Sequence, residues 1–221
     1  RSEIYEVGLN STYTVVISPS GPLLTSFATG SWVFGHACGV SSANDLYCWG
    51  ENTYGQLGTG STSEAYSLNL VASLTGQVAQ AATGYSFTCV VTTSGGAKCW
   101  GYNYYGQLGD GTTTQRLTPT DVSGLTSGVV KIATGSNHAC AVKSDGTVVC
   151  WGNDGQGQLG NGAGGNSNTP VAFSGIAAGA TDIATGLNAS CAIVNGGVKC
   201  WGNGWTAGNG TYTNQQAPVD V

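Results

Sequence analysis

Eight cysteines in four evenly spaced pairs are the residues of this chain whose type and spacing can do chemistry. Each pair frames one copy of a segment that ends in Cys-Trp-Gly, and its second cysteine falls at residue 48, 99, 150 or 200. A period near 50 residues is typical of a repeat architecture. Paired thiols can form a disulfide or contribute to a zinc site. The pairs are Cys38 with Cys48, Cys89 with Cys99, Cys140 with Cys150, and Cys191 with Cys200.

The residues between the two cysteines of each pair predict a β-hairpin. In the last copy eight residues intervene and place Asn195 and Gly196 in a two-residue turn, the signal of a type I′ hairpin. In the other copies nine residues intervene, so the loop holds three residues. Its third position needs a positive φ and holds Asn44, Gly95 or Gly146, which are residue types that tolerate this conformation.

The hairpin geometry selects the disulfide pairing. Cysteines that face each other on antiparallel strands have Cα atoms about 4.5 to 5.5 Å apart, which a disulfide can bridge. We therefore predict one disulfide within each hairpin. Zinc binding is the weaker interpretation, because the sequence has no C-x2-C pair and only His36 and His138 as imidazole ligands. We expect no metal and no cofactor.

The composition indicates the cellular compartment and excludes some classes of partner. Four disulfides are typical of an oxidising compartment, so we expect a secreted, extracellular or cell-surface protein. The net charge is −5 with six Lys and Arg, which leaves little to neutralise phosphates or to attract anionic lipid. The chain has no apolar run of the roughly 20 residues that span a bilayer. We therefore expect neither nucleic-acid binding nor membrane insertion.

Two sequence features concern processing of the chain. The sequence contains no methionine, so we expect that Arg1 is not the translated start and that upstream residues have been removed. Three N-x-S/T sequons predict possible glycan sites in a secreted protein, at Asn10, Asn188 and Asn209.

Strand patterns divide the chain into an N-terminal extension, residues 1–23, and a repeat domain, residues 24–221. The extension holds one candidate strand at residues 13–17, rich in β-branched and aromatic residues. The third copy shows four strands most clearly, at residues 117–122, 129–134, 138–143 and 147–151. Four-stranded units repeated around an axis are the blades of a propeller. The predicted fold is therefore an all-β propeller of about four blades, with one hairpin disulfide in each blade.

Three further motifs recur with the same period. An Ala-Thr-Gly motif places small residues where neighbouring blades approach near an axis. A tryptophan follows the second cysteine of each copy and is expected to pack against the disulfide or the next blade. Gly-Gln-Leu-Gly loops lack a GK[ST] sequence and a following helical pattern, so they predict tight turns with one buried leucine and not a nucleotide site. The fourth copy departs from this motif and reads WTAGNG at residues 205–210, which we interpret as the mark of a capping unit.

The combination of HACAV…VVCWGNDGQGQLGNG with this period resembles the repeat of the regulator of chromosome condensation family of β-propellers, over about residues 28–221. The resemblance implies a propeller fold. It implies no single function, because the family includes a nuclear guanine-nucleotide exchange factor, bacterial inhibitors of β-lactamases and many surface proteins. Members usually close a ring of seven blades, whereas four are counted here, and the paired cysteines suit a secreted member.

In this strand assignment two segments compete to complete the first blade. Residues 217–221 match residues 117–122 and would close a four-bladed ring within one chain. The candidate strand at residues 13–17 would fill the same place and leave the C-terminal strand to pair with another molecule. The second arrangement predicts a homopolymer.

The titratable residues do not converge as an active site requires, so we expect no enzymatic activity. The carboxylates Asp110, Asp145 and Asp154 fall in turns, where Asp serves the backbone. His36 and His138 are interpreted as strand-entry residues, and His138 is aligned with Thr88 and Ser190.

We expect a binding scaffold for a protein or glycan. Its candidate surface consists of aromatic residues in the loops between blades, namely Tyr54, Tyr104, Tyr105 and Trp205. Two alternatives remain open: a structural subunit of an extracellular filament or surface layer built by strand exchange, and a fragment of a longer seven-bladed propeller.

Overall fold

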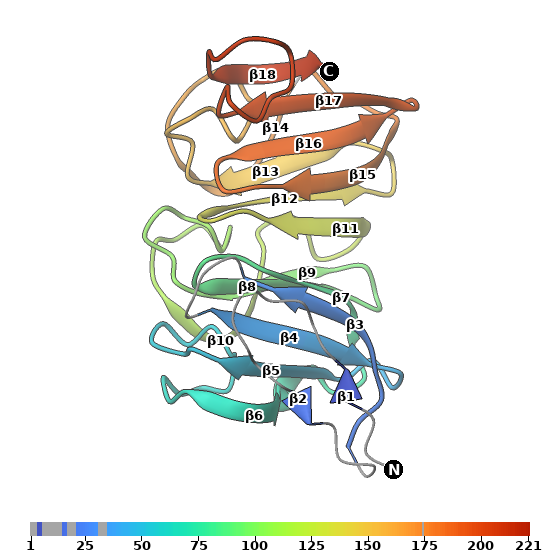
Figure 1. The fold of residues 1–221 in the computed structure, drawn as a ribbon, viewed down its shortest axis with the longest axis vertical. Coiled ribbons are helices and arrows are strands. Elements are labelled where there is room, and N and C mark those ends of the chain that lie inside the picture. Colours follow the sequence, from blue (N-terminus) through green and yellow to red (C-terminus); the bar gives the residue numbers. More distant parts are fainter. Residues whose placement is uncertain (1–3, 6–14, 17–20, 31–34, 174) are drawn as a thin grey trace.

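The computed structural model describes residues 4–5, 15–16, 21–30, 35–173 and 175–221. Four antiparallel sheets of four strands follow one another along the chain, as Figure 1 shows, and a single-turn 3-10 helix, η1 (Ala72–Leu74), follows the first sheet. Each sheet is one blade, so the predicted all-β propeller architecture with four-stranded blades is confirmed.

Every blade uses four strands that are consecutive in the sequence. The strands of the four blades, in chain order, are β3 (Leu24–Thr29), β4 (His36–Ser41), β5 (Leu46–Gly50) and β6 (Ala65–Leu70); β7 (Val78–Thr83), β8 (Phe87–Thr92), β9 (Ala97–Gly101) and β10 (Arg116–Asp121); β11 (Val129–Thr134), β12 (His138–Lys143), β13 (Val148–Gly152) and β14 (Ser167–Ala172); and β15 (Ala180–Thr185), β16 (Ala189–Val194), β17 (Gly197–Gly202) and β18 (Gln215–Asp220).

The hairpins form as the turn residues predict. Asn44, Gly95 and Gly146 have φ of 61°, 80° and 77°, and Asn195 and Gly196, at 51° and 82°, make the two-residue turn. The two cysteines of each copy are opposite each other in the β-ladder, with Cα atoms 4.0 to 4.1 Å apart. All four predicted disulfides are present.

The assignment of strands to blades differs by one strand from the sequence-based prediction. β10 pairs with β9 and not with β11, so it is the outermost strand of the second blade. β18 likewise pairs with β17 and completes the fourth blade. Closure of the first blade by residues 217–221 is therefore wrong. The physical reason is that the long loop after each Cys-Trp-Gly strand folds back on itself and returns the chain to the strand it has just left.

The N-terminal extension contributes one short pair of strands. β1 (Ile4–Tyr5) pairs with β2 (Val15–Val16) in a sheet of its own. The rest of the predicted strand at residues 13–17 lies outside the described residues, as does Asn10. The division at residue 23 stays a prediction.

A tryptophan holds each of blades two to four against the blade before it. Trp100, Trp151 and Trp201 are fully buried, and each indole Nε1 donates a 2.9 Å hydrogen bond to a backbone carbonyl of the preceding Gly-Gln-Leu-Gly loop. The contact is with the preceding blade and not with the next one, and each ring lies in the same buried cluster as the disulfide of that preceding blade. The leucines of these loops are fully buried, as predicted; they are Leu57, Leu108 and Leu159.

The last glycine of each loop permits this contact. A Cβ added at Gly109 would lie 2.8 Å from the indole of Trp151, and Gly58 and Gly160 approach their tryptophans equally closely. These glycines also have φ between 68° and 73°. The absence of a side chain therefore sets the spacing between blades.

We predict that Gly109→Ala destabilises the protein more than Gly111→Ala, by about 1 to 3 kcal/mol. Both glycines lie in the same loop with positive φ, but the added Cβ of Gly111 would meet its nearest atom at 3.7 Å. The backbone penalty is common to both variants, so the difference isolates the clash with Trp151. Urea denaturation measures it, and equal midpoints would show that the loop yields without cost.

Candidate binding surface

The loops after the third strand of blades one to three share one internal framework. In the first two blades the side-chain Oδ1 of Asn52 or Asn103 accepts a hydrogen bond from the backbone N–H of the buried leucine, and the Nδ2 donates to two carbonyls farther along the loop. Asp154 occupies this place in the third blade. Because the strands are antiparallel, these loops lie on one face of the propeller together with the loops after the first strands.

The glutamine of each Gly-Gln-Leu-Gly loop joins the blade contact to this face. The backbone carbonyl of Gln107 accepts the bond from Trp151, and the side-chain Oε1 accepts one from the backbone N–H of Tyr105 at 2.9 Å. Gln56 holds the backbone of Tyr54 in the same way. The contact that fixes a blade therefore also fixes the backbone that carries a tyrosine.

Four tyrosines from the first two blades form one cluster. Tyr102 is at its centre, with ring centroids 4.8 Å from Tyr54 and 6.4 Å from both Tyr104 and Tyr105, and the last two lie 5.0 Å apart in a T-shaped arrangement. Tyr104 is 69% exposed. Burial and then the neighbouring phenols raise the pKa of Tyr102, so the ring at the centre of the cluster keeps its phenol proton at neutral pH.

A small hollow lies beside this cluster. Its volume is about 230 Å³, and it is lined by Tyr54, Tyr85, Ser86, Tyr102, Tyr105 and Asn137. Drug-sized ligands and cofactors occupy cavities of about 300 to 1,000 Å³. The hollow is suited to one side chain of a larger partner.

The tyrosines are not needed to build the loops. The third blade has Asn153, Gly155 and Gln156 where the second has Tyr102, Tyr104 and Tyr105, yet its loop keeps the same hydrogen bonds to the leucine and the glutamine. If the tyrosines served only to cover neighbouring blades, the third blade would need them as well. The concentration of aromatic rings over blades one and two therefore points to binding.

The predicted surface residues fall into two places. Tyr54, Tyr104 and Tyr105 lie together, and the structure adds Tyr102 and Tyr85, which the sequence analysis missed. Tyr102 directly follows Cys-Trp-Gly, and its position in the repeat next to the other loop tyrosines was the available signal. Trp205 lies in the fourth blade, where it packs on Tyr212 with centroids 5.0 Å apart.

The two predicted glycan sites within the described residues differ in surroundings. Asn188 is exposed, but the serine of its sequon, Ser190, is buried between blades. Asn209 is half-buried and accepts hydrogen bonds from the backbone and side chain of Thr211. Glycan attachment at these positions stays a prediction.

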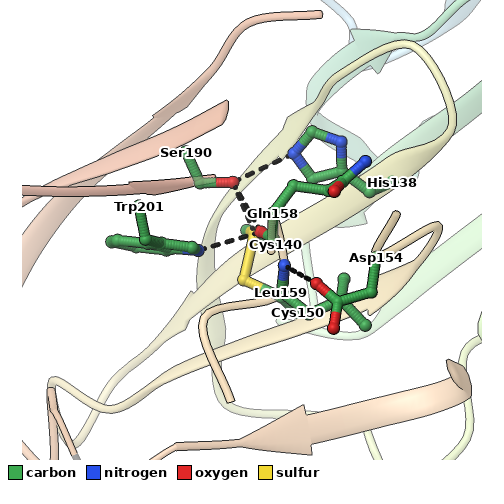
Figure 2. Close-up of a disulfide and its surroundings, with 8 residues drawn as sticks. All are labelled: His138, Cys140, Cys150, Asp154, Gln158, Leu159, Ser190 and Trp201. Atoms are coloured by element: carbon green, nitrogen blue, oxygen red, sulfur yellow. Dashed lines mark hydrogen bonds between the residues drawn. A yellow bond between two sulfur atoms is a disulfide. The ribbon is translucent and has the colours of Figure 1, made fainter. Parts of the chain in front are cut away.

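The two histidines lie in the contacts between blades. Figure 2 shows His138 next to Ser190, with its Nε2 2.9 Å from the serine hydroxyl, which also donates to the Gln158 carbonyl at 3.0 Å. His36 and Thr88 make the equivalent arrangement between blades one and two. Since the hydroxyl proton goes to the carbonyl, each histidine donates from Nε2. Burial lowers the pKa of both imidazoles, so they are neutral at neutral pH.

The alignment of His138 with Thr88 and Ser190 is corrected by the strand register. His138 is opposite Gly152, whereas the residue opposite Gly101 is Phe87. The histidines therefore correspond to Phe87 and Ala189, and Thr88 and Ser190 face them from the following blade. Their position at strand starts is as expected.

The carboxylates accept hydrogen bonds from neighbouring residues of their own turns and loops. Asp145 accepts two hydrogen bonds from Thr147, which hold its pKa at about 2. Asp110 pairs with Arg116 and Thr112; burial alone would raise its pKa, but these bonds lower it. Among the described residues no group of three His, Cys, Asp or Glu could hold a metal ion. No described helix is long and apolar enough to cross a bilayer.

Comparison with known proteins identifies the family. The sequence matches the regulator of chromosome condensation (RCC1) repeat over residues 44–91, 95–142 and 145–193. The chain therefore belongs to the RCC1 repeat family. It is an RCC1-like β-propeller, a kind of protein-interaction scaffold.

The chain matches only part of the length of its longer relatives. It is 34% identical over 194 residues to the human probable E3 ubiquitin-protein ligase HERC4. The matched region covers 84% of this chain but only 18% of HERC4. The structure of human WBSCR16 superimposes with a TM-score of 0.82 at 24% identity, over 98% of this chain and 58% of that one. Yeast RCC1 (Prp20), solved bound to Kap60, gives 0.80 at 18% identity, over 95% and 50%.

We predict that the protein loses stability in acid through its histidines. Burial lowers the pKa of His36 to about 3 and that of His138 to about 4, although an interaction of the imidazole with the backbone of Ala189, in which the ring donates, partly opposes the shift at His138. The unfolded chain binds these protons first, near pH 6.5. Stability is therefore complete above pH 6.5 and falls below it by about 1.4 kcal/mol per pH unit for each histidine.

The control for this prediction uses the second blade as a template. The double variant His138→Phe with Ser190→Ala copies the apolar pair Phe87 and Ala139. Urea unfolding at several pH values should show about half the histidine-dependent slope for this variant above pH 4, compared with the unmodified protein. An unchanged slope would mean that His138 does not carry the acid response.

We predict that Asp154→Asn stabilises the protein by about 1 to 2 kcal/mol at neutral pH. The buried Oδ2 of Asp154 has no hydrogen-bond partner among the described residues, and burial raises the pKa of this carboxyl. An amide could donate to the loop carbonyls as Asn103 does. The reciprocal variant, Asn103→Asp, should destabilise the second blade, and thermal unfolding that moves both variants in the same direction would contradict the assignment.

Proposed function

We propose that this protein is a non-catalytic scaffold of the extracellular space or cell surface, and that it binds a protein partner through the tyrosine cluster of its first two blades. The observation that carries the proposal is the aromatic cluster itself, which the third blade does without while keeping the same loop. Exposed tyrosines supply a large, rigid contact area at low entropic cost and are enriched in binding hot spots.

The shape of the surface favours a peptide segment. The hollow of about 230 Å³ takes one side chain, and the exposed ring of Tyr104 next to it provides a flat surface for a second. The lining consists of tyrosine, serine and asparagine, and it contains no Asp, Glu, Lys or Arg. An apolar or aromatic side chain flanked by backbone is therefore the expected ligand.

The disulfides support the proposed compartment. All eight cysteines are paired, seven of them are buried, and six of these lie in the buried clusters between blades. Such disulfides form in oxidising compartments and are rare in the cytosol. No observation favours assembly by strand exchange over this function, because β18 is already paired within its own blade.

Peptide selection tests the binding surface directly. A phage-displayed random peptide library is selected on the immobilised protein, and the affinity of the selected peptides is measured by fluorescence anisotropy. We predict that Tyr104→Ser weakens binding by at least about tenfold, the loss expected for an interface anchor. The matched variant Trp205→Ser, which removes an equally exposed ring from the fourth blade, should change affinity less than about twofold.

Two results would contradict the proposal. One is selected peptides that bind the Tyr104→Ser variant as tightly as the unmodified protein. The other is a glycan array in which the same tyrosines bind sugars while no peptide is selected. Circular dichroism of both variants confirms that the fold is kept.

A further inference from the structure

Each contact between blades contains a glutamine whose side-chain amide points toward the following blade. Between blades two and three the Nε2 of Gln107 donates to the Oδ1 of Asn137 at 3.2 Å. Between blades three and four the Nε2 of Gln158 donates to Asn153 at 2.7 Å and lies 3.5 Å from the Oδ1 of Asn188. In both contacts an asparagine of the following blade therefore supplies an acceptor at this place.

The contact between blades one and two lacks this acceptor. Ser86 stands where the other contacts have Asn137 and Asn188, since each of the three residues directly precedes the second strand of its blade. The side chain of Gln56 is fully buried, and its Nε2 has no hydrogen-bond partner among the described residues. A buried amide donor without an acceptor is destabilising. The first contact is therefore short of both an acceptor and the side-chain volume of an asparagine.

The hollow beside the tyrosine cluster lies at this place. Its lining includes Ser86 and also Tyr54, whose backbone N–H donates to the Oε1 of Gln56 at 2.9 Å. A serine side chain is shorter than that of asparagine, so it leaves room next to the loop. The space that an asparagine fills in the other two contacts is thus open to a ligand here.

The hollow also presents an amide donor of its own. Asn137 lines it, and the Oδ1 of Asn137 already accepts from Gln107, so the Nδ2 is the atom that can serve a ligand. No charged side chain lines the hollow, and the chain carries a net charge of −5, which disfavours a carboxylate ligand. The acceptor that fits these conditions is a neutral amide carbonyl.

Aromatic rings in two orientations surround this donor. The rings of Tyr102 and Tyr104 are nearly parallel, at 11°, whereas Tyr105 meets them at 78° and 87°. The hollow therefore offers ring faces to a compact apolar group and a hydrogen-bond donor to a carbonyl next to it.

Proline meets both requirements within one residue. A run of prolines offers backbone carbonyls but no N–H groups that the hollow would leave without acceptors. The polyproline II helix has no internal hydrogen bonds and is ordered before binding, and aromatic-lined grooves recognise it in other proteins. It rises about 3.1 Å per residue, so two residues span about the 6.4 Å between the rings of Tyr102 and Tyr104.

We propose, on the basis of the binding surface described under the proposed function, that the partner presents an uncharged, proline-rich segment in the polyproline II conformation. One proline ring occupies the hollow beside Ser86, and a carbonyl next to it accepts a hydrogen bond from the Nδ2 of Asn137. The exposed ring of Tyr104 packs against a neighbouring residue of the same segment.

Fluorescence anisotropy of the full chain with a fluorescein-labelled peptide of repeated Ala-Pro-Pro units tests the chemistry of the ligand. This peptide should bind at least about tenfold more tightly than a matched peptide with serine in place of every proline, because serine adds N–H groups and a flexible backbone. A third peptide with N-methylalanine in place of proline lacks the N–H but also the ring, and its affinity should lie between the two. Equal affinity of the proline and serine peptides would overturn the proposal.

Ser86→Asn gives the first contact the side chain that the other contacts have. It should weaken binding of the Ala-Pro-Pro peptide at least about tenfold by taking up the space of the hollow, and it should raise the urea midpoint by pairing the amide of Gln56. Asn188→Ser is the matched control, since it makes the opposite change in the contact between blades three and four, and it should leave the affinity unchanged.

Tyr105→Gln provides a second variant that does not depend on how an asparagine packs at residue 86. It copies Gln156 of the third blade, whose loop keeps the same hydrogen bonds, and removes one ring from the lining of the hollow. Binding of the Ala-Pro-Pro peptide should again fall at least about tenfold. Full affinity in both Ser86→Asn and Tyr105→Gln would place the proline elsewhere and contradict the proposal.

Selection from the random peptide library separates this proposal from the proposed function. Selected peptides that require Tyr104 but contain no proline would overturn the proline preference and leave the binding surface in place. Failure of every peptide, the Ala-Pro-Pro probe included, would overturn both.

Discussion

The contact on which the structure depends is the hydrogen bond from a tryptophan indole to a backbone carbonyl of the preceding blade. A single hydrogen bond adds little net stability, about 1 kcal/mol, but here it fixes a fully buried ring against a glycine that has no room for a side chain. Three such contacts, at Trp100, Trp151 and Trp201, set the spacing of the four blades.

The glutamine that accepts the tryptophan hydrogen bond also positions the backbone of the tyrosine surface. The carbonyl of Gln107 accepts from the tryptophan, and its side chain holds the backbone of Tyr105. The position of the tyrosine is therefore a consequence of how the blades pack. A binding surface fixed in this way pays little entropy when a partner arrives.

The repeats separate the positions that build the fold from those that are free to vary. Cysteine, tryptophan, glycine and glutamine recur where blades touch, and the contacts at these places hardly change from copy to copy. The loop positions that carry Tyr102 and Tyr104 carry Asn153 and Gly155 in the next blade without altering the loop. Function in such a protein lies in the differences between its repeats.

Local sequence determined the hairpins, their turns and their disulfides, because these depend on residues close together in the chain and on the positive φ that Asn44, Gly95 and Gly146 tolerate. The repeat period and the Cys-Trp-Gly and Gly-Gln-Leu-Gly motifs determined the propeller fold, and three of the clustered tyrosines were recognised from their loops. Tertiary structure decided to which blade each outer strand belongs, since the residues of a strand such as β10 do not specify its neighbour and the path of the preceding loop brings it to β9. It also decided that Tyr102 joins the cluster, that Trp205 lies apart from it, and that the histidines face hydroxyls across blades, because these depend on distances between residues about 50 positions apart that no local pattern contains.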